Sequence, residues 1–232
     1  MMSITKIWNK IRRKWMKIRL QPIRVYCFHH VSAVFDADSM NRGDWMQIDE
    51  FKNKVLALQQ DGVEFISLAE AYSHICKDWI RCRKYAVLTF DDGYASLKEI
   101  LLWLEEQCIP ATLFVNGKYL DGKSYRKTPK EKYLTYAELF ALISPLIEIG
   151  SHGWEHTDAS VMTEAEFAES MQQNVQLLSA HPRYVPFHAY TWGRHTSSSD
   201  TTLSNLHVVP VLMDGIKNYN DPTCLHRELL NP

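Results

Sequence analysis

Two short segments of this chain contain the residue types that hold a metal ion for hydrolysis. Residues 89–93 (TFDDG) supply two adjacent carboxylates, Asp91 and Asp92, and residues 151–156 (SHGWEH) supply two imidazoles four residues apart, His152 and His156. Two neutral imidazoles and one carboxylate form a three-ligand site with an open position for water, the arrangement of catalytic zinc, and related divalent ions fit it as well. The two segments therefore predict a hydrolytic metal site.

Each segment follows a short apolar run that is typical of a buried strand. The runs are residues 85–88 and 146–150. Since catalytic groups in α/β barrels collect at the carboxyl ends of the strands, we expect the two segments to converge on one face. Adjacent residues on a regular strand point to opposite sides, so we expect a turn beginning at Gly93 to bring Asp91 and Asp92 to the same site.

The rest of the chain alternates between strand and helix patterns. We expect further strands at 63–68 and 111–115 and a last strand at 207–213, and we expect helices at 48–60, 69–79, 96–107, 136–143 and 163–178. The last of these helices opens with a capping signature at residues 163–166. The alternation argues for parallel strands with right-handed crossovers, and by itself it also permits a doubly wound sheet.

The two chemical segments, in this order and spacing, resemble the polysaccharide deacetylase family, also called the NodB-homology or carbohydrate esterase 4 family. The resemblance covers most of the chain. Residues 190–193 (YTWG) look like an altered form of a third family motif, and residues 23–31 look like the family's first strand. The resemblance implies an α/β fold, a distorted or incomplete (β/α) barrel of about seven parallel strands. We expect residues 21–232 to form this catalytic domain and residues 1–20 to be a separate amphipathic, basic helix.

The resemblance also implies roles for individual residues. Asp91 would be the catalytic base, and Asp92, His152 and His156 would hold a divalent metal, with zinc as the expected ion. The backbone N–H of Tyr190 would stabilise the oxyanion by analogy with the family. The expected activity is removal of acetyl groups from the N-acetylated sugars of a polysaccharide or oligosaccharide.

The group that protonates the leaving amine is harder to identify from the sequence. Many family members use a histidine near the last barrel strand, but in this chain residues 207–213 are followed by Asp214 and Gly215. The remaining candidates are three histidines, namely His226, His195 and His30. Arg227, next to His226, is expected to favour the ionised form of Asp91 or to hold an anionic group.

Four residues are candidates for contacting the substrate: Trp154, Trp192, Arg227 and His30. Indole rings suit the apolar faces of pyranose sugars, although aromatic side chains also fill protein cores. A second function class stays open because the third motif is altered and the terminal histidine is missing. In this alternative the chain is a non-catalytic carbohydrate-binding or scaffold relative with a degenerate site.

Charge is distributed unevenly along the 232 residues. The whole chain has a formal net charge of -1, yet residues 1–20 contain seven basic residues and no acidic one, which leaves about -8 for the rest. Tryptophan and isoleucine recur among these basic residues at helical spacing, a pattern typical of a helix that lies on an anionic membrane surface. Packing of this helix on the barrel or on a partner subunit is the alternative. No nucleic-acid-binding module is recognisable, so we expect no nucleic-acid partner.

The cysteine pattern and the N-terminus bear on the cellular compartment. Five cysteines (Cys27, Cys76, Cys82, Cys108, Cys224) without a CxxC pair indicate neither a disulfide framework nor a thiolate zinc site. The N-terminal segment lacks the apolar stretch of a secretory signal, and no apolar stretch is long enough to span a membrane. We therefore expect a cytoplasmic protein, peripheral on the inner membrane face, which would meet lipid-linked or nucleotide-linked sugars.

Overall fold

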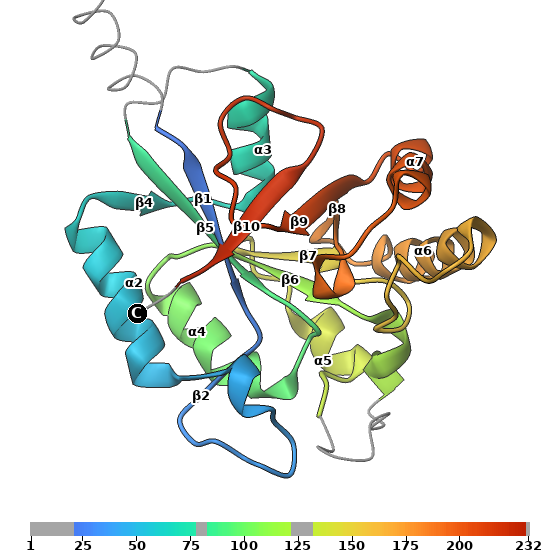
Figure 1. Ribbon diagram of the computed structural model, residues 1–232. Helices are drawn as coiled ribbons and strands as arrows, with labels where there is room; N and C mark the ends of the chain where they lie inside the picture. Colours follow the sequence, from blue (N-terminus) through green and yellow to red (C-terminus); the bar gives the residue numbers. More distant parts are fainter. Residues whose placement is uncertain (1–20, 78–82, 122–131, 231–232) are drawn as a thin grey trace, which may run out of the picture.

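The computed structural model describes residues 21–77, 83–121 and 132–230 (Figure 1). The predicted helix within residues 1–20 lies outside these residues. Within the described part of the chain, no helix combines the length and the apolar character needed to cross a membrane.

Seven parallel strands form a closed barrel. Around the ring, neighbours follow the order β1-β10-β9-β8-β7-β6-β5, and β5 pairs with β1 to close it. The strands are β1 (Ile23–Phe28), β5 (Lys84–Phe90), β6 (Ala111–Val115), β7 (Ile147–Ser151), β8 (Tyr184–Ala189), β9 (Val209–Met213) and β10 (Leu225–Leu229). The pairing of β7 with β8 is irregular between Ile149 and Ser151, which distorts the ring. This confirms the predicted distorted barrel of seven parallel strands and excludes the doubly wound sheet.

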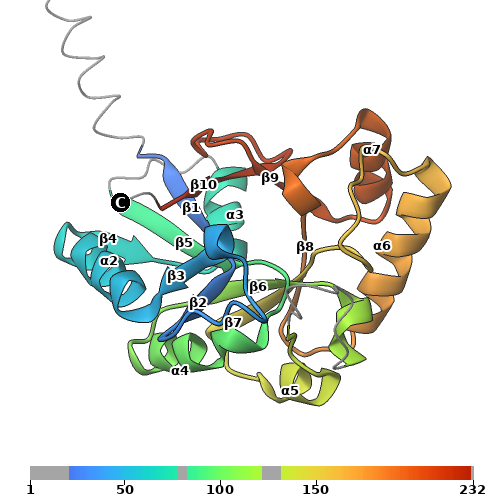
Figure 2. The same cartoon turned by 60° about the horizontal axis from the view of Figure 1, so that its bottom comes forward.

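Helices surround the barrel (Figures 1 and 2). They are α2 (Ile48–Gln60), α3 (Leu68–Cys76), α4 (Lys98–Glu106), α5 (Tyr136–Ala141), α6 (Glu164–Leu178) and α7 (Ser197–Asn205). The predicted capping signature is confirmed, because the Thr163 side chain accepts from the backbone of Glu166 and the Glu166 side chain accepts from the backbone of Thr163. A short parallel pair, β2 (His30–Ser32) and β3 (Trp45–Gln47), lies beside α2 and α4 (Figure 2).

The strand expected at 63–68 is present only as β4 (Val63–Phe65), outside the ring. It pairs with the first residues of β5, whereas β6 pairs with the last ones. The helix α3 then begins at Leu68, and its first backbone N–H donates to the buried carboxylate of Glu148 on β7 at 2.9 Å. Glu148 also accepts from Thr112 of β6 at 3.0 Å. These contacts satisfy buried polar groups that would otherwise destabilise the barrel.

The prediction that residues 207–213 form the last strand is wrong. A further strand, β10, follows and lies between β9 and β1 in the ring. Its sequence, LHREL, lacks an apolar run because a charged side chain, Arg227, points inward and is 1% exposed. The last barrel strand is therefore β10, with Arg227 as its middle residue.

Candidate active site

The chain turns sharply after β5, where the two aspartates lie. The N–H of Asp91 donates to the carbonyl of Phe28 at 2.9 Å and so continues the pairing of β5 with β1. Asp92 has φ 70°, in the left-handed region that aspartate tolerates better than most residues. Gly93 follows with φ 76°, and a Cβ there would lie 2.7 Å from the side chain of Val115. The predicted turn thus exists, and it starts at Asp92 itself.

Asp92, His152 and His156 meet in the geometry of a metal site. The Oδ1 atom of Asp92 lies 3.3 Å from Nε2 of each histidine. In a tetrahedral zinc site, Zn–N and Zn–O bonds of about 2.0–2.2 Å separate neighbouring ligand atoms by about 3.3–3.5 Å. The separations match this expectation, and the ligand atoms of all three residues lie within 4.8 Å of one another.

The hydrogen bonding of His152 and Asp92 suits the binding of a metal ion. The Nδ1 of His152 lies 2.7 Å from the carbonyl of Ala189, so Nδ1 donates and Nε2 keeps its lone pair toward Asp92. The Oδ1 of Asp92 is buried and has no hydrogen-bond partner among the described residues. Burial alone would raise the pKa of Asp92, but His152 and His156 outweigh it and hold that pKa well below the usual range. A divalent cation fits a buried, ionised and unsatisfied carboxylate oxygen of this kind.

The second carboxylate, Asp91, is held by Arg227. The two guanidinium Nη atoms donate to the two carboxylate oxygens at 2.6 Å and 2.8 Å, and both side chains are buried. Burial favours the neutral acid, yet the charge of Arg227, with help from His152, lowers the pKa of Asp91 to about 2. Asp91 is therefore ionised at neutral pH, which confirms the direction predicted for the influence of Arg227.

Both carboxylates face a cavity of about 350 Å³ at the carboxyl ends of the strands. Residues of β1, β9 and β10, residues that follow β1, β5, β7 and β8, and residues just before β3 line it. They include Cys27, His29, Asn41, Asp44, Tyr94, Tyr190, Trp192, Met213 and Arg227 together with Asp91, Asp92, His152 and His156. Trp192 is 59% exposed, and its ring meets that of His156 at 88° with centroids 4.6 Å apart. The cavity thus combines charged groups with an accessible aromatic face.

A family model described as Polysaccharide deacetylase matches residues 80–210, more than half of the chain and the part that contains Asp91, Asp92, His152 and His156. The chain belongs to the polysaccharide deacetylase family. No curated protein matches the sequence.

Solved structures share the deacetylase fold over nearly the whole chain. IcaB from Ammonifex degensii aligns with a TM-score of 0.78 and 22% identity, covering 92% of this chain and 94% of that one. The Streptococcus pyogenes deacetylase PplD, solved in complex with acetate, aligns with a TM-score of 0.79 and 17% identity over the same shares. A de-N-acetylase from Aggregatibacter actinomycetemcomitans gives 0.76 and 15%, over 91% and 95%. At these identities the likeness establishes the fold.

Two histidines predicted for this deacetylase site lie outside the cavity. The Nδ1 of His30 lies 2.9 Å from the hydroxyl of Ser96, and its ring stacks on Tyr94 with centroids 3.6 Å apart. His226 has its Nδ1 2.8 Å from a carboxylate oxygen of Asp214. In both cases the neighbouring residue, His29 or Arg227, lines the cavity instead. The reason is strand alternation, because adjacent side chains point to opposite sides.

Three further predicted residues make contacts other than the expected ones. Tyr190 lines the cavity, its N–H donates to the carbonyl of Val211 at 3.3 Å, and its hydroxyl donates to Asp200 at 2.9 Å. The pairing of β8 with β9 thus extends to Tyr190, and the role of its N–H as an oxyanion donor stays a prediction. Trp154 lines a neighbouring cavity with Glu155 and Ser170, whereas Trp192 reaches the metal-site cavity. His195, the remaining acid candidate, pairs with Asp200 outside the cavity.

Seven cavity residues were not among the predicted site residues: Cys27, His29, Asn41, Asp44, Tyr94, Gly193 and Met213. For the first two the sequence contains a signal, because Cys27 and His29 are two residues apart on a predicted strand and so share one face. Asn41 and Asp44 come from an irregular loop, where no periodicity indicates which side chains face the site.

Proposed function

We propose that this family member hydrolyses the acetamido groups of an N-acetylated polysaccharide or oligosaccharide with one divalent ion, zinc, held by Asp92, His152 and His156. The observation that carries this proposal is the convergence of two Nε2 atoms on one buried oxygen of Asp92, both at 3.3 Å. A second, ionised carboxylate, Asp91, lines the same cavity. Retention of both features weighs against a non-catalytic, degenerate relative.

Asp91 is the proton acceptor in this proposal. A carboxylate with a pKa of about 2 accepts a proton only from an acidified water, and a bound divalent ion supplies that acidity and polarises the acetyl carbonyl. Arg227 fixes the orientation of the Asp91 carboxylate through two hydrogen bonds. Asp91 therefore acts from a fixed position rather than through high basicity.

His29 is the proposed proton donor to the leaving amine. It lines the cavity, and one of its ring nitrogens lies within 4.8 Å of a carboxylate oxygen of Asp91. His30, His195 and His226 do not line this cavity. Comparing an amide substrate with an activated ester tests this role, because a phenolate leaves without a proton.

The exposed indole of Trp192 offers a surface for the apolar face of a pyranose ring beside the metal site. The carboxylate of Asp44 and the amide of Asn41 lie on the lining of the same cavity, where hydroxyl groups of a sugar can donate or accept hydrogen bonds. These groups support a carbohydrate as the substrate class.

Metal analysis tests the ligand assignment without a substrate. Purified protein is expected to contain near-stoichiometric zinc by inductively coupled plasma mass spectrometry, and His152→Ala is expected to lose it because one of three ligands is gone. The matched control is His74→Ala, which changes a histidine on α3 that pairs with Glu70. Wild-type protein that stays free of metal after reconstitution would refute the metal-dependent hydrolase.

We also propose that residues 1–20 attach the protein to an anionic membrane surface on the cytoplasmic side. Seven basic residues with tryptophan and isoleucine between them support electrostatic attraction combined with burial of apolar side chains. Deletion of residues 1–20 is expected to abolish co-sedimentation with vesicles of anionic phospholipid at low salt. Neutral phosphatidylcholine vesicles are the control. Equal binding by the deletion variant would disprove attachment through this segment, and cleavage by protease added to intact spheroplasts would disprove the cytoplasmic side.

A further inference from the structure

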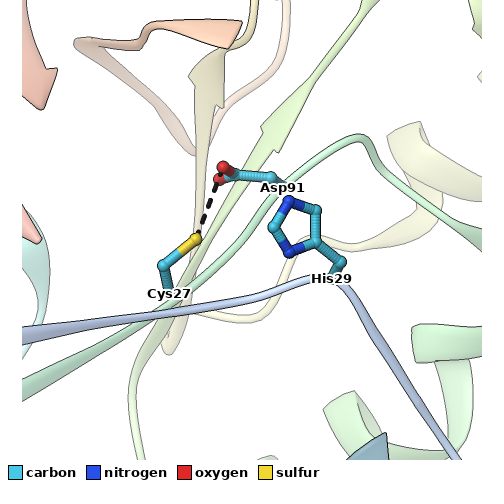
Figure 3. Close-up of side chains that lie close together, drawn as sticks. All are labelled: Cys27, His29 and Asp91. Atoms are coloured by element: carbon cyan, nitrogen blue, oxygen red, sulfur yellow. Dashed lines mark hydrogen bonds between the residues drawn. The ribbon is translucent and has the colours of Figure 1, made fainter. Parts of the chain in front are cut away.

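Three metal-binding side chains of the cavity that are not ligands of the first ion lie close together. They are Cys27, His29 and Asp91, and Figure 3 shows them pointing toward one another. Cys27 and His29 lie two residues apart at the end of β1, and Asp91 follows β5, which pairs with β1 along its whole length. One ligand atom from each of the three lies within 4.8 Å of the other two. We call these residues the Cys27–His29–Asp91 cluster.

We propose that the Cys27–His29–Asp91 cluster is a second, weaker site for a thiophilic divalent cation such as Zn²⁺ or Cd²⁺, and that an ion bound there inhibits the enzyme. The inhibition rests on the proposed function, whereas the binding does not. The cysteine spacing in the sequence gave no indication of a thiolate site, because its ligands come from two strands.

The spacing of the cluster suits such an ion. The Sγ of Cys27 lies 3.5 Å from Oδ2 of Asp91 (Figure 3). A tetrahedral zinc ion with Zn–S of about 2.3 Å and Zn–O of about 2.0–2.2 Å separates these two ligand atoms by about 3.5–3.7 Å. Together the three residues offer sulfur, nitrogen and oxygen donors on the lining of a cavity that an ion can enter.

Asp91 can serve this site while it stays paired with Arg227. A carboxylate has about four acceptor positions, two on each oxygen. Arg227 uses one on Oδ1 and one on Oδ2. The other position on Oδ2 accepts the thiol of Cys27 and becomes available when the thiol loses its proton.

The state of the thiol determines which ions bind. Burial raises the pKa of Cys27 well above its usual value, although the charge of Arg227 opposes this. At neutral pH the residue is a thiol, and binding of M²⁺ replaces the S–H proton, which passes to solvent as the sulfur–metal bond forms. Zinc and cadmium form strong thiolate bonds, whereas magnesium and calcium prefer oxygen ligands. The proton release and the nearby Arg227 charge make this site weaker than the first.

Occupation of the cluster would block both proton-transfer groups of the proposed reaction. The ion would bind the carboxylate that accepts a proton and the imidazole that donates one. The first ion, held by Asp92, His152 and His156, would stay in place. Excess zinc would therefore inhibit an enzyme that needs one zinc ion for activity.

Titration of metal-free protein with Co²⁺ tests the second site without a substrate. Cobalt bound to a thiolate shows sulfur-to-metal charge-transfer absorption in the near ultraviolet, which nitrogen and oxygen ligands do not produce. We expect the first equivalent to give only visible d–d bands and the second to give the charge-transfer band. Cys27→Ser should lose this band and keep the first equivalent, whereas Cys108→Ser, which changes an exposed cysteine, should behave as wild type.

His152→Ala separates the two sites, because it should lose the first equivalent and keep the charge-transfer band. A wild-type titration without this band, or a band that persists in Cys27→Ser, would overturn the second site. The latter result would point to another thiol, such as Cys224, whose Sγ lies 3.5 Å from Nε2 of His226. If wild-type protein bound no metal at the first site but still showed the charge-transfer band, the proposed function would be contradicted and the second site would still stand.

The same variants test the inhibition. With acetate release as the assay, the activity of Cys27→Ser is measured relative to its own value when it is loaded with one equivalent of zinc, because Cys27 contacts Asp91. The variant should tolerate at least about tenfold more free zinc than wild type before losing half of its own activity, a difference of about 1.4 kcal/mol in binding. Equal zinc sensitivity of Cys27→Ser and wild type would refute inhibition through the cluster.

Discussion

Asp91→Asn is expected to lower the rate of acetate release by about 10²- to 10⁴-fold, the usual contribution of a general base. Asparagine keeps the shape of the side chain but cannot accept the proton from water. The ligand atoms of the first site belong to other residues, so the zinc content should not change. Acetate release from N-acetylated oligosaccharides and metal analysis of the same preparation measure the two quantities. A loss of the first equivalent of zinc in Asp91→Asn would mean that Asp91 is a ligand of the first ion rather than the base.

His29→Gln provides a matched comparison for the same experiment. With an N-acetylated sugar, both variants should lose activity, because the leaving amine needs a proton. With 4-nitrophenyl acetate, whose phenolate leaves without protonation, His29→Gln should stay close to wild type and Asp91→Asn should remain impaired. An equal loss on both substrates in His29→Gln would contradict its role as proton donor and indicate that it positions the substrate or Asp91.

The metal site was predictable because its ligands follow apolar runs. Residues 85–88 and 146–150 indicate buried strands by composition alone, and strand ends converge in a barrel of parallel strands. The two motifs therefore indicated three candidate ligands and one candidate base, and the structure places all four residues around one cavity. The capping signature at Thr163 also involves only residues that are close in the sequence, so it was predictable as well.

Predicting the other cavity residues requires knowing which face of a strand each side chain occupies. A shift of one residue moves every side chain to the opposite face, and the sequence around His29 and His30 does not reveal which of them faces inward. The strand β10 was missed for a related reason. Its inward residue, Arg227, is charged, and it is stable there only because it pairs with Asp91, 136 residues earlier in the chain. No local pattern indicates such a pairing.

Arg227→Met is expected to lower the free energy of unfolding at neutral pH by about 3–5 kcal/mol, which is typical when one partner of a buried ion pair is removed. Methionine replaces much of the aliphatic stem, so the loss comes chiefly from leaving the Asp91 carboxylate buried without a counter-charge. The two side chains are 1% and 4% exposed, so solvent screens their interaction little. Urea unfolding of the zinc-loaded variant and wild type measures the difference.

The pH dependence of this loss identifies its cause. In wild type the pKa of Asp91 is about 2, below the ordinary 3.8, so Asp91 contributes stability above about pH 4 that is lost as the pH falls toward 2. Without Arg227 the main group that lowers the pKa of Asp91 is gone, so this pKa rises and the ionised carboxylate stabilises the fold less. The difference between variant and wild type should therefore already reach most of its neutral-pH value at about pH 4.5, and it should shrink steeply as the pH falls toward 2, where Asp91 takes up a proton in wild type as well.

The double variant Asp91→Asn, Arg227→Met separates charge from packing. Because it removes both charges, it should be more stable at neutral pH than Arg227→Met alone. If the double variant were as unstable as Arg227→Met, the loss would come from packing around the guanidinium, including its contact with the Phe114 ring at 5.4 Å. In that case Arg227 would be a structural residue of the barrel, and the low pKa of Asp91 would depend on His152 and the bound ion. A rescue would instead show that the buried pair stabilises the fold while it keeps the proposed base ionised.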